Sequence, residues 1–209
     1  MQQFWSSLVS LESVAVLTAI AYLLLAAREN LWCWACAFVS STLYTYIFWD
    51  VRLLMESALN VFYVVMAVVG WWEWRYGGKQ HEGLRIHRLR GWQHAALIAA
   101  VLVLASVNGY MIQRYTHGAF PFLDSFTTWG AVVTTFLVVR KVLENWLYWL
   151  VVDSVSIYLY IDRGLYLTAL LFAAYLIIVL FGWRRWLLEY RQQQAAADAR
   201  DAPDQGVAA

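Results

Sequence analysis

Three side chains spaced four residues apart, Asn145, Trp149 and Asp153, have the chemistry to bind a small polar molecule. In an α-helix this spacing places them along one face over about 12 Å of helix length. An indole stacks on an aromatic ring, a carboxylate balances positive charge, and an amide bonds a hydroxyl or a carboxamide. The stripe therefore predicts a site for a planar, cationic ligand. The alternative is that Asp153 belongs to an internal hydrogen-bond network or pairs with a basic residue.

Other polar side chains in apolar surroundings extend this candidate site. Asn60 either bonds the ligand or bonds a neighbouring helix, and Tyr63 either lines a path or fills the interior. Asp124 follows Pro121 and either satisfies the free amides of a helix start or attracts a cation to the mouth of a path. The threonines after it, Thr135 among them, give the same segment hydroxyls that can face the path.

The composition places these residues in a membrane protein. The chain has 209 residues, 62% of them hydrophobic and 17% aromatic, with a mean hydropathy of +0.54. Soluble domains have about 45–50% apolar residues, so a polytopic membrane protein is predicted. The net charge of +1 gives no argument for nucleic-acid binding. No Walker sequence, serine elbow or metal-ligand spacing is found, so no cofactor or metal is expected, and an intramembrane enzyme is a remote alternative.

Seven apolar segments are long enough to span a bilayer as helices, which requires about 20 residues each. Because only two prolines are present, these helices should be mostly unbroken. A polar segment at 75–90 follows the third of them, and the Ala-, Gln- and Asp-rich tail 191–209 is expected to be disordered. The predicted spans lie near residues 10–27, 31–49, 53–74, 92–112, 121–139, 143–161 and 164–186.

The distribution of basic residues predicts how the chain is inserted. With the amino terminus outside, twelve of the fifteen Lys and Arg residues fall on the inner side. This asymmetry satisfies the positive-inside rule. We therefore expect a periplasmic amino terminus and a cytoplasmic carboxyl terminus.

An internal repeat explains the odd number of helices. Glu29-Asn30-xxx-Trp34 returns 115 residues later as Glu144-Asn145-xxx-Trp149. A second block returns 112 residues later, and the difference of three predicts a shorter loop in the second copy. Two three-helix copies joined by one extra helix give a 3 + 1 + 3 arrangement of parallel repeats, with a path between them. The second block pairs Tyr63, Gly70, Trp71 and Trp74 with Tyr175, Gly182, Trp183 and Trp186.

This repeat divides the chain and adds to the candidate site. The predicted parts are a first bundle at 1–76, a loop and linker helix at 77–112, a second bundle at 113–190, and the tail. Trp34 joins the predicted binding residues as the counterpart of Trp149, whereas Asp153 is matched by Phe38, which implies a ligand with one distinctive end. Glu29, Glu144 and Arg140 are predicted to form gating ion pairs at the inner side. The GWWEW and GWRRW sequences are interpreted as interfacial anchors, with a gate as the alternative.

The chain resembles the PnuC family of bacterial nicotinamide riboside transporters. The resemblance covers about residues 10–190 and includes the Arg140-Lys141 pair. It is carried by ENWLYWLVVDSVSIYLYIDRGLYLTALLFAAYL with GWRRW, by ENLWCWACAFVSSTLY and YVVMAVVGWWEW in the first half, and by FLDSF. It implies a SWEET-like seven-helix fold in the inner membrane, facilitated diffusion of the vitamin, a homotrimer, and a cytoplasmic kinase that traps the imported substrate. The family's Asn–Trp–Asp binding motif falls on Asn145, Trp149 and Asp153.

One departure from the family leaves the substrate open. Members that carry nicotinamide riboside have a glutamine toward the inner half of the fifth span, where this chain has the run from Val133 to Phe136, VTTF. Relatives of the family are associated with thiamine, riboflavin or deoxynucleosides. Because thiamine and nicotinamide riboside are both cationic aromatics, Trp149 and Asp153 cannot separate them.

Overall fold

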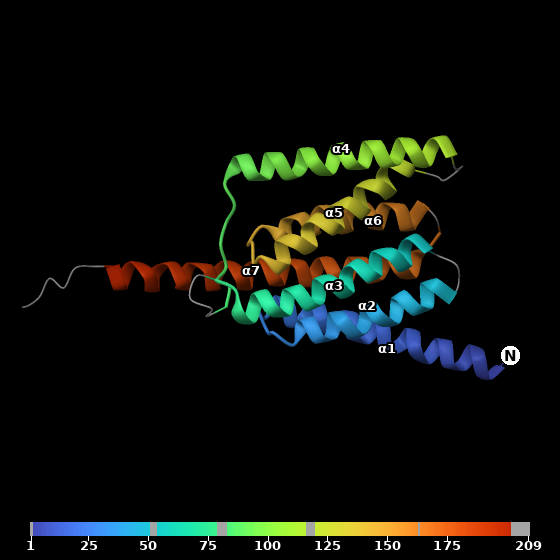
Figure 1. The fold of residues 1–209 in the computed structure, drawn as a ribbon, viewed down its shortest axis with the longest axis horizontal. Coiled ribbons are helices and arrows are strands. Elements are labelled where there is room, and N and C mark those ends of the chain that lie inside the picture. The colour runs from blue at the N-terminus through green and yellow to red at the C-terminus, as the bar shows by residue number, and fades with distance from the viewer. Residues whose placement is uncertain (1, 51–53, 79–82, 116–119, 163, 202–209) are drawn as a thin grey trace, which may run out of the picture.

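Seven α-helices make up nearly all of the described chain. The computed structural model describes residues 2–50, 54–78, 83–115, 120–162 and 164–201. The seven predicted spans are confirmed as helices in the same order (Figure 1). The helices are α1 (Gln2–Ala27), α2 (Cys33–Asp50), α3 (Leu54–Tyr76), α4 (Gly91–Tyr115), α5 (Pro121–Val139), α6 (Asn145–Asp162) and α7 (Tyr166–Asp201).

The last helix corrects the prediction of a disordered tail. α7 continues to Asp201, well past the predicted end of the seventh span, and leaves the bundle as an extended rod (Figure 1). Ala, Gln, Glu and Arg have high helix propensity, and no Gly or Pro interrupts the helix between Gly182 and Pro203. Residues 191–201 therefore continue the helix, and 202–209 lie outside the described residues.

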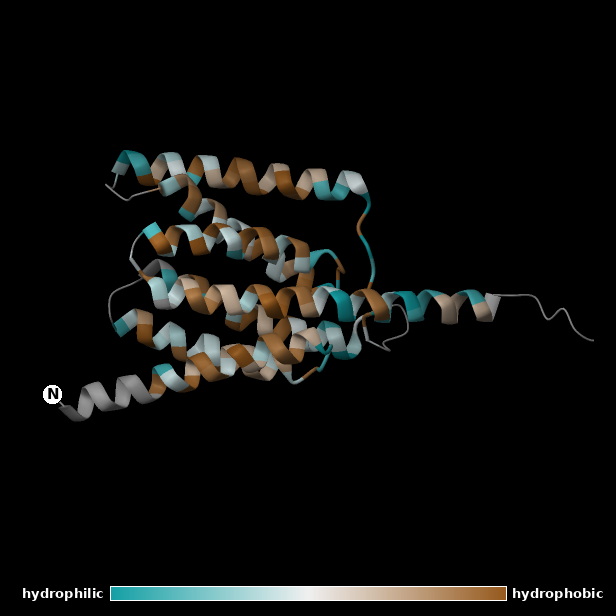
Figure 2. Cartoon of the chain, turned by 180° about the vertical axis from the view of Figure 1, so that it is seen from behind, coloured by the Kyte–Doolittle hydropathy of each residue, from teal (hydrophilic) through white to brown (hydrophobic). Residues whose placement is uncertain are grey.

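The surface of the bundle is apolar between two polar ends. Within the described chain, α4, α5 and the Thr168–Ala199 part of α7 are long and apolar enough to cross a membrane by length and composition. α2 and α6, with 18 residues each, are about 27 Å long and approach the hydrocarbon thickness. Apolar residues cover the outward faces of the helices, and polar ones gather at the helix ends and on the protruding part of α7 (Figure 2).

Six helices form a closed ring, and α4 lies outside it. Contacts connect α1 to α2, α2 to α3, α3 to α5, α5 to α6, α6 to α7, and α7 back to α1. The backbone of α4 lies close to that of α5 alone among the described helices, and His94 at its start also reaches Tyr148 of α6, with 2.9 Å between Nδ1 and the hydroxyl. The helices opposite each other across the ring are α1 and α5, α2 and α6, and α3 and α7, and within the described chain the backbones of these pairs do not approach each other. The ring therefore has an interior that all six helices face.

The structure corrects the register of the repeat. α2 and α6 begin and end 112 residues apart, at Cys33 and Asn145 and at Asp50 and Asp162. The turns before them also match, because Glu29 and Lys141 have positive φ angles of 53° and 52°. One offset of 112 thus relates both halves, and the predicted three-residue slip is wrong. The counterpart of Trp34 is Trp146 rather than Trp149, and Asp153 corresponds to Ser41 rather than Phe38.

Candidate functional site

Asp153 lies inside the ring of helices. It is in the middle of α6 and is only 5% exposed. No ion pair or hydrogen bond joins its carboxylate to another described residue. Its charge acts on the hydroxyls of Tyr63 on α3 and Tyr175 on α7, which are repeat counterparts on opposite helices. A carboxylate within electrostatic range of both tyrosines lies inside the ring, between α3 and α7.

The two other members of the stripe lie nearer the start of α6. Asn145 is fully buried, and its Nδ2 donates a hydrogen bond to the Val142 carbonyl at 2.7 Å. Its Oδ1 has no hydrogen-bond partner among the described residues. Trp149 is half-buried and packs against the hydrophobic core. Since these residues share one helix face with Asp153, α6 presents an amide oxygen, an indole and a carboxylate in series.

The remaining predicted binding residues are more dispersed. The Asn60 amide donates to the Glu56 carbonyl of its own helix at 2.9 Å, which leaves its oxygen available. The buried Thr135 hydroxyl donates to the Ala131 carbonyl at 2.8 Å, so it can only accept from a ligand. Asp124 is half-buried in the first turn of α5, at the end of the bundle away from Asn145. The structure brings Tyr63 close to Asp153 and places Asp124 apart from both.

Trp34 lies in the hydrophobic core and packs on a glycine. Its ring covers Gly70, where an added Cβ would lie 2.5 Å from the indole. Its repeat counterpart Trp146 covers Gly182 in the same way, with a Cβ placed 2.6 Å from its ring. Both indoles are 2% exposed. Each Gly–Trp contact lets the third helix of a half approach its second helix closely.

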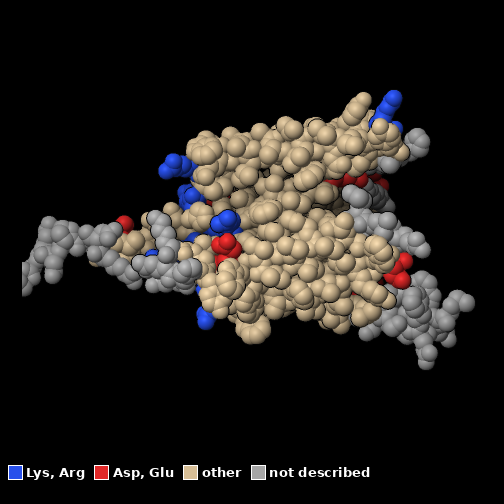
Figure 3. All heavy atoms as spheres, viewed as in Figure 1, with Lys and Arg blue, Asp and Glu red and all other residues tan. Residues whose placement is uncertain are grey.

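Four tryptophans connect the two halves at one end of the ring. This end, called the basic end below, contains the α1–α2 and α5–α6 turns and the point where α7 leaves the bundle. Lys and Arg side chains gather there (Figure 3). Ring contacts run across the halves in the order Trp34, Trp74, Trp186 and Trp146, with centroid separations of 5.3, 5.8 and 5.5 Å.

Two hydrogen bonds across the halves fix this tryptophan cluster. Trp74 Nε1 donates to the Val138 carbonyl at 3.1 Å, and Trp186 Nε1 donates to the Ala26 carbonyl at 3.0 Å. The two bonds are repeat counterparts, each leading from one half to the other. Trp74 and Trp186 come from the predicted anchor sequences, but they are 6% and 0% exposed and therefore close the ring instead of facing the interface. In the sequence, the feature that could have indicated this role is that Trp74 and Trp186 each follow a glycine, Gly70 or Gly182, by four residues.

Ion pairs also cross between the halves at the basic end. Lys141 Nζ is 3.1 Å from Glu29 Oε2 and 4.7 Å from the centre of the Trp74 ring. Arg140 lies 4.0 Å from Glu73 of α3. Burial raises the pKa of Glu29 above its usual value, although the Lys141 ammonium lowers it in part. The two charges are thus partly desolvated where the halves meet.

Reversing one charge of the Glu29–Lys141 pair should destabilise the protein, and exchanging both should restore it. Glu29→Lys or Lys141→Glu alone places like charges about 3 Å apart in a partly buried site, at a cost of about 2 kcal/mol. The double variant re-forms the pair and should recover most of this loss. Thermal unfolding of the four proteins in detergent measures the coupling. Arg191→Glu, at an exposed position on α7, is the control and should change little.

Glu144 binds the linker before α4 rather than the opposite half. Its carboxylate accepts a hydrogen bond from Arg88 Nε at 2.7 Å and one from the Leu89 amide at 3.4 Å, and this contact raises the pKa of Arg88. The same linker pairs with the α5–α6 turn through the backbone, since the His87 amide donates to Lys141 and its carbonyl accepts from Leu143. These hydrogen bonds and the ion pair fasten the end of the linker to the second half.

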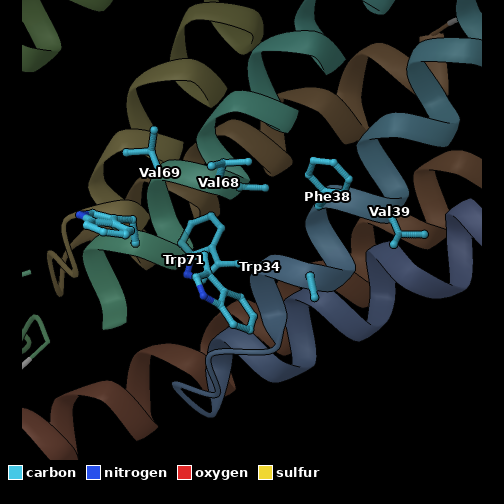
Figure 4. Close-up of a pocket in the computed structure, with 9 residues that line it drawn as sticks. Trp34, Phe38, Val39, Val68, Val69 and Trp71 are labelled. Carbon is cyan, nitrogen blue, oxygen red and sulfur yellow. The ribbon is translucent and has the colours of Figure 1, made fainter. Parts of the chain in front are cut away.

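A large apolar groove lies on the outside of the ring, between α2 and α3. It has a volume of about 610 Å³, and Phe38, Val39, Val68 and Trp72 line it with exposed side chains (Figure 4). None of its lining residues carries a charge. Such a surface suits lipid chains, and a cationic, hydroxylated ligand finds no polar partner in it. The ring interior around Asp153 is the better candidate site.

Comparisons with known proteins agree on one family of transporters. A sequence model described as nicotinamide mononucleotide transporter matches residues 9–188. The nicotinamide riboside transporter PnuC of Escherichia coli (strain K12) is 24% identical to the chain over 212 residues, which covers 90% of this chain and 89% of that protein. The riboflavin/roseoflavin transporter RibM of Streptomyces davaonensis is 26% identical, with 87% and 86% covered. The crystal structure of the vitamin B3 transporter PnuC superposes with a TM-score of 0.68 at 25% identity, covering 87% of this chain and 82% of that one.

Proposed function

The chain belongs to the nicotinamide mononucleotide transporter family, and on this premise we propose that it carries nicotinamide riboside across the inner membrane. Membership of this family makes the chain a membrane transporter and not an enzyme. The proposed process is facilitated diffusion by alternating access, without a coupled ion. The unpaired carboxylate of Asp153 inside the ring carries the assignment of the substrate, because a buried negative charge without a partner favours a cationic ligand.

In the proposed site the substrate lies between α6 and the opposite wall of the ring. The nicotinamide ring stacks on Trp149, and Asp153 balances its positive charge. Asn145 and Asn60 bond polar substituents through their free amide oxygens, with Tyr63 and Thr135 as further lining residues. Asp124, at the far end of the bundle, attracts the cation to the entrance.

Alternating access requires the halves to separate at the basic end, where the tryptophan cluster and the ion pairs hold them together. We propose that the halves α1–α3 and α5–α7 are parallel repeats joined by α4, divided at 1–76, 77–112 and 113–190, and that they rock about the site. The Glu29–Lys141 and Glu73–Arg140 pairs separate when the basic end opens, while Glu144 keeps the linker on the second half. The crossing contacts, which link α1 to α7 and α5 to α3, support this pairing of repeats.

The same proposal includes the orientation of the protein in the membrane, its oligomeric state and the fate of the imported substrate. The positive-inside rule places the basic end and the carboxyl terminus in the cytoplasm and the amino terminus in the periplasm. α4 lies outside the ring and exposes apolar side chains such as Leu102, Val103 and Val107, which leaves a face for the proposed homotrimer. Imported substrate would be retained after phosphorylation by a cytoplasmic kinase.

Riboflavin is the second candidate substrate. The similarity to RibM over most of both chains favours it, and the VTTF run at Val133–Phe136 stands where the family resemblance implies a glutamine in carriers of nicotinamide riboside. Riboflavin is neutral, so its binding would leave Asp153 without a counter-charge. Thiamine is cationic and fits Trp149 and Asp153 as nicotinamide riboside does.

Calorimetric titration of the purified protein with nicotinamide riboside, thiamine and riboflavin tests the proposal. We expect saturable binding of nicotinamide riboside, and uptake of the same compound into proteoliposomes without an ion gradient. Preference for riboflavin or thiamine would contradict the proposed substrate and keep the transporter assignment. Uptake that stops when the proton gradient is collapsed would contradict facilitated diffusion.

A further inference from the structure

We propose that Ser41 on α2 contacts the substrate from the wall opposite Asp153 and bonds a hydroxyl of its sugar or sugar-alcohol part. This inference rests on the proposed function. It assigns a second wall to the site, where α6 supplies the ionic contact and α2 supplies a neutral hydrogen bond.

The position of Ser41 follows from the corrected repeat. Ser41 and Asp153 are 112 residues apart, the offset that relates α2 to α6 throughout. α2 and α6 lie opposite each other in the ring, and their backbones do not approach each other. The axis between the halves maps one position onto the other, so a side chain at position 41 faces the interior as Asp153 does. Phe38, the counterpart expected from the sequence, instead lines the outer groove (Figure 4).

A neighbouring side chain shows which way this face of α2 points. Tyr44 lies one turn further along the same face, and its hydroxyl interacts electrostatically with that of Tyr175 on α7. α7 is not adjacent to α2 in the ring, so this interaction crosses the interior. Tyr175 in turn interacts with Asp153. Tyr44 of α2 and Asp153 of α6 thus both lie within electrostatic range of Tyr175.

Ser41 as a residue is mostly buried, while its hydroxyl is not among the fully enclosed polar atoms and is available. Ser41 is 8% exposed, and its hydroxyl makes no hydrogen bond to another described residue. Other hydroxyls in these helices donate to a carbonyl four residues earlier, as Thr42, Ser154 and Ser156 do at 2.7–3.0 Å. Buried polar groups usually have a partner. An interior serine without one has both its donor and its acceptor free for a ligand.

The two walls are chemically different, and this difference orients the ligand. Asp153 accepts hydrogen bonds and carries charge, so it selects the cationic ring. Serine is neutral and both donates and accepts, which matches a sugar hydroxyl that does the same. A ligand with a charged ring at one end and hydroxyls at the other would lie across the ring of helices, from α6 to α2.

Binding of nicotinamide riboside and of 1-methylnicotinamide to wild type, Ser41→Ala and Ser40→Ala tests the inference. 1-Methylnicotinamide retains the cationic ring and lacks the sugar. In Ser41→Ala we expect the affinity for nicotinamide riboside to fall about fivefold to tenfold, the loss of one hydrogen bond, and that for 1-methylnicotinamide to stay unchanged. Ser40 is the matched control, because its hydroxyl donates to the Ala15 carbonyl of α1 at 2.9 Å. Its alanine variant should melt at a lower temperature and bind both ligands normally.

Equal affinity of wild type and Ser41→Ala for nicotinamide riboside would overturn the inference, and so would an equal loss for both ligands. If Ser41→Ala does not fold, Ser41→Cys treated with a small thiol reagent replaces it. Modification beyond that of wild type, slowed by the bound ligand, supports the position, and unprotected modification contradicts it. A wild type that binds riboflavin alone would refute the proposed substrate, and the comparison of riboflavin with lumichrome, which lacks the hydroxylated chain, would then test Ser41 independently.

Discussion

Replacing Asp153 by Asn should weaken binding of nicotinamide riboside by about a hundredfold or more and at the same time raise the melting temperature of the empty protein. The substitution keeps the shape of the side chain and removes its charge. Loss of one partner of a buried charge pair costs about 2–5 kcal/mol of binding free energy. In the absence of ligand, the carboxylate is buried with no counter-charge among the described residues, which is unfavourable for the folded state. Calorimetric titration and thermal unfolding of the same preparation measure both effects.

The opposite signs of these two effects separate a binding role from a structural one. Asp162, exposed at the end of α6, is the matched control, and Asp162→Asn should change neither quantity. A lower melting temperature in Asp153→Asn would show that the carboxylate supports the fold. Unchanged affinity for the cationic ligand would remove Asp153 from the site.

Replacing Trp186 by Ala should destabilise the protein by about 4 kcal/mol, the largest effect expected on the fold. Trp186 is fully buried at the boundary between the halves, where its ring contacts Trp74 and Trp146. Truncation leaves a cavity there, removes these contacts and deletes the hydrogen bond to the Ala26 carbonyl. Large-to-small changes of buried aromatic residues cost about 3–5 kcal/mol. Thermal unfolding in detergent should show a large drop in melting temperature.

Two further substitutions divide this effect into its parts. Trp186→Phe retains an aromatic ring and loses the indole donor, so it should cost about 1 kcal/mol for the hydrogen bond, plus a smaller packing loss. Trp72→Ala removes an indole that is 65% exposed on α3 and should have little effect. If Trp72→Ala lowered the melting temperature as much as Trp186→Ala, the tryptophan cluster at the basic end would not be the source of the lost stability.

The helices and the stripe on α6 could be predicted from the sequence because both depend on local patterns. Apolar runs of about 20 residues determine the spans, and a spacing of four residues determines a common helix face. The register of the repeat could not be obtained in this way. The letters Glu-Asn-xxx-Trp match at an offset of 115 by coincidence, whereas the equivalent backbone turns at Glu29 and Lys141 lie 112 apart. Because Glu29 and Lys141 are different residue types at equivalent positions, a comparison of residue identities does not detect that the two turns are equivalent.

The closure at the basic end also depends on geometry that the sequence does not display. Tryptophans near basic residues at the end of a span usually lie at the membrane interface. Trp74 and Trp186 are buried instead because each reaches a carbonyl of the opposite half. Such contacts join residues 64 and 160 positions apart, and no local pattern indicates them.

The Glu29–Lys141 pair also determines which halves can assemble. The two residues occupy the same position in the two copies and meet each other at the axis. Two copies of the first half would oppose Glu29 to Glu29, and two copies of the second would oppose Lys141 to Lys141. Like charges at a self-facing position disfavour both homodimers, and the opposite charges favour the heterodimer. The difference at this single position thus favours pairing one first half with one second half, a preference that a symmetric dimer of identical halves cannot have.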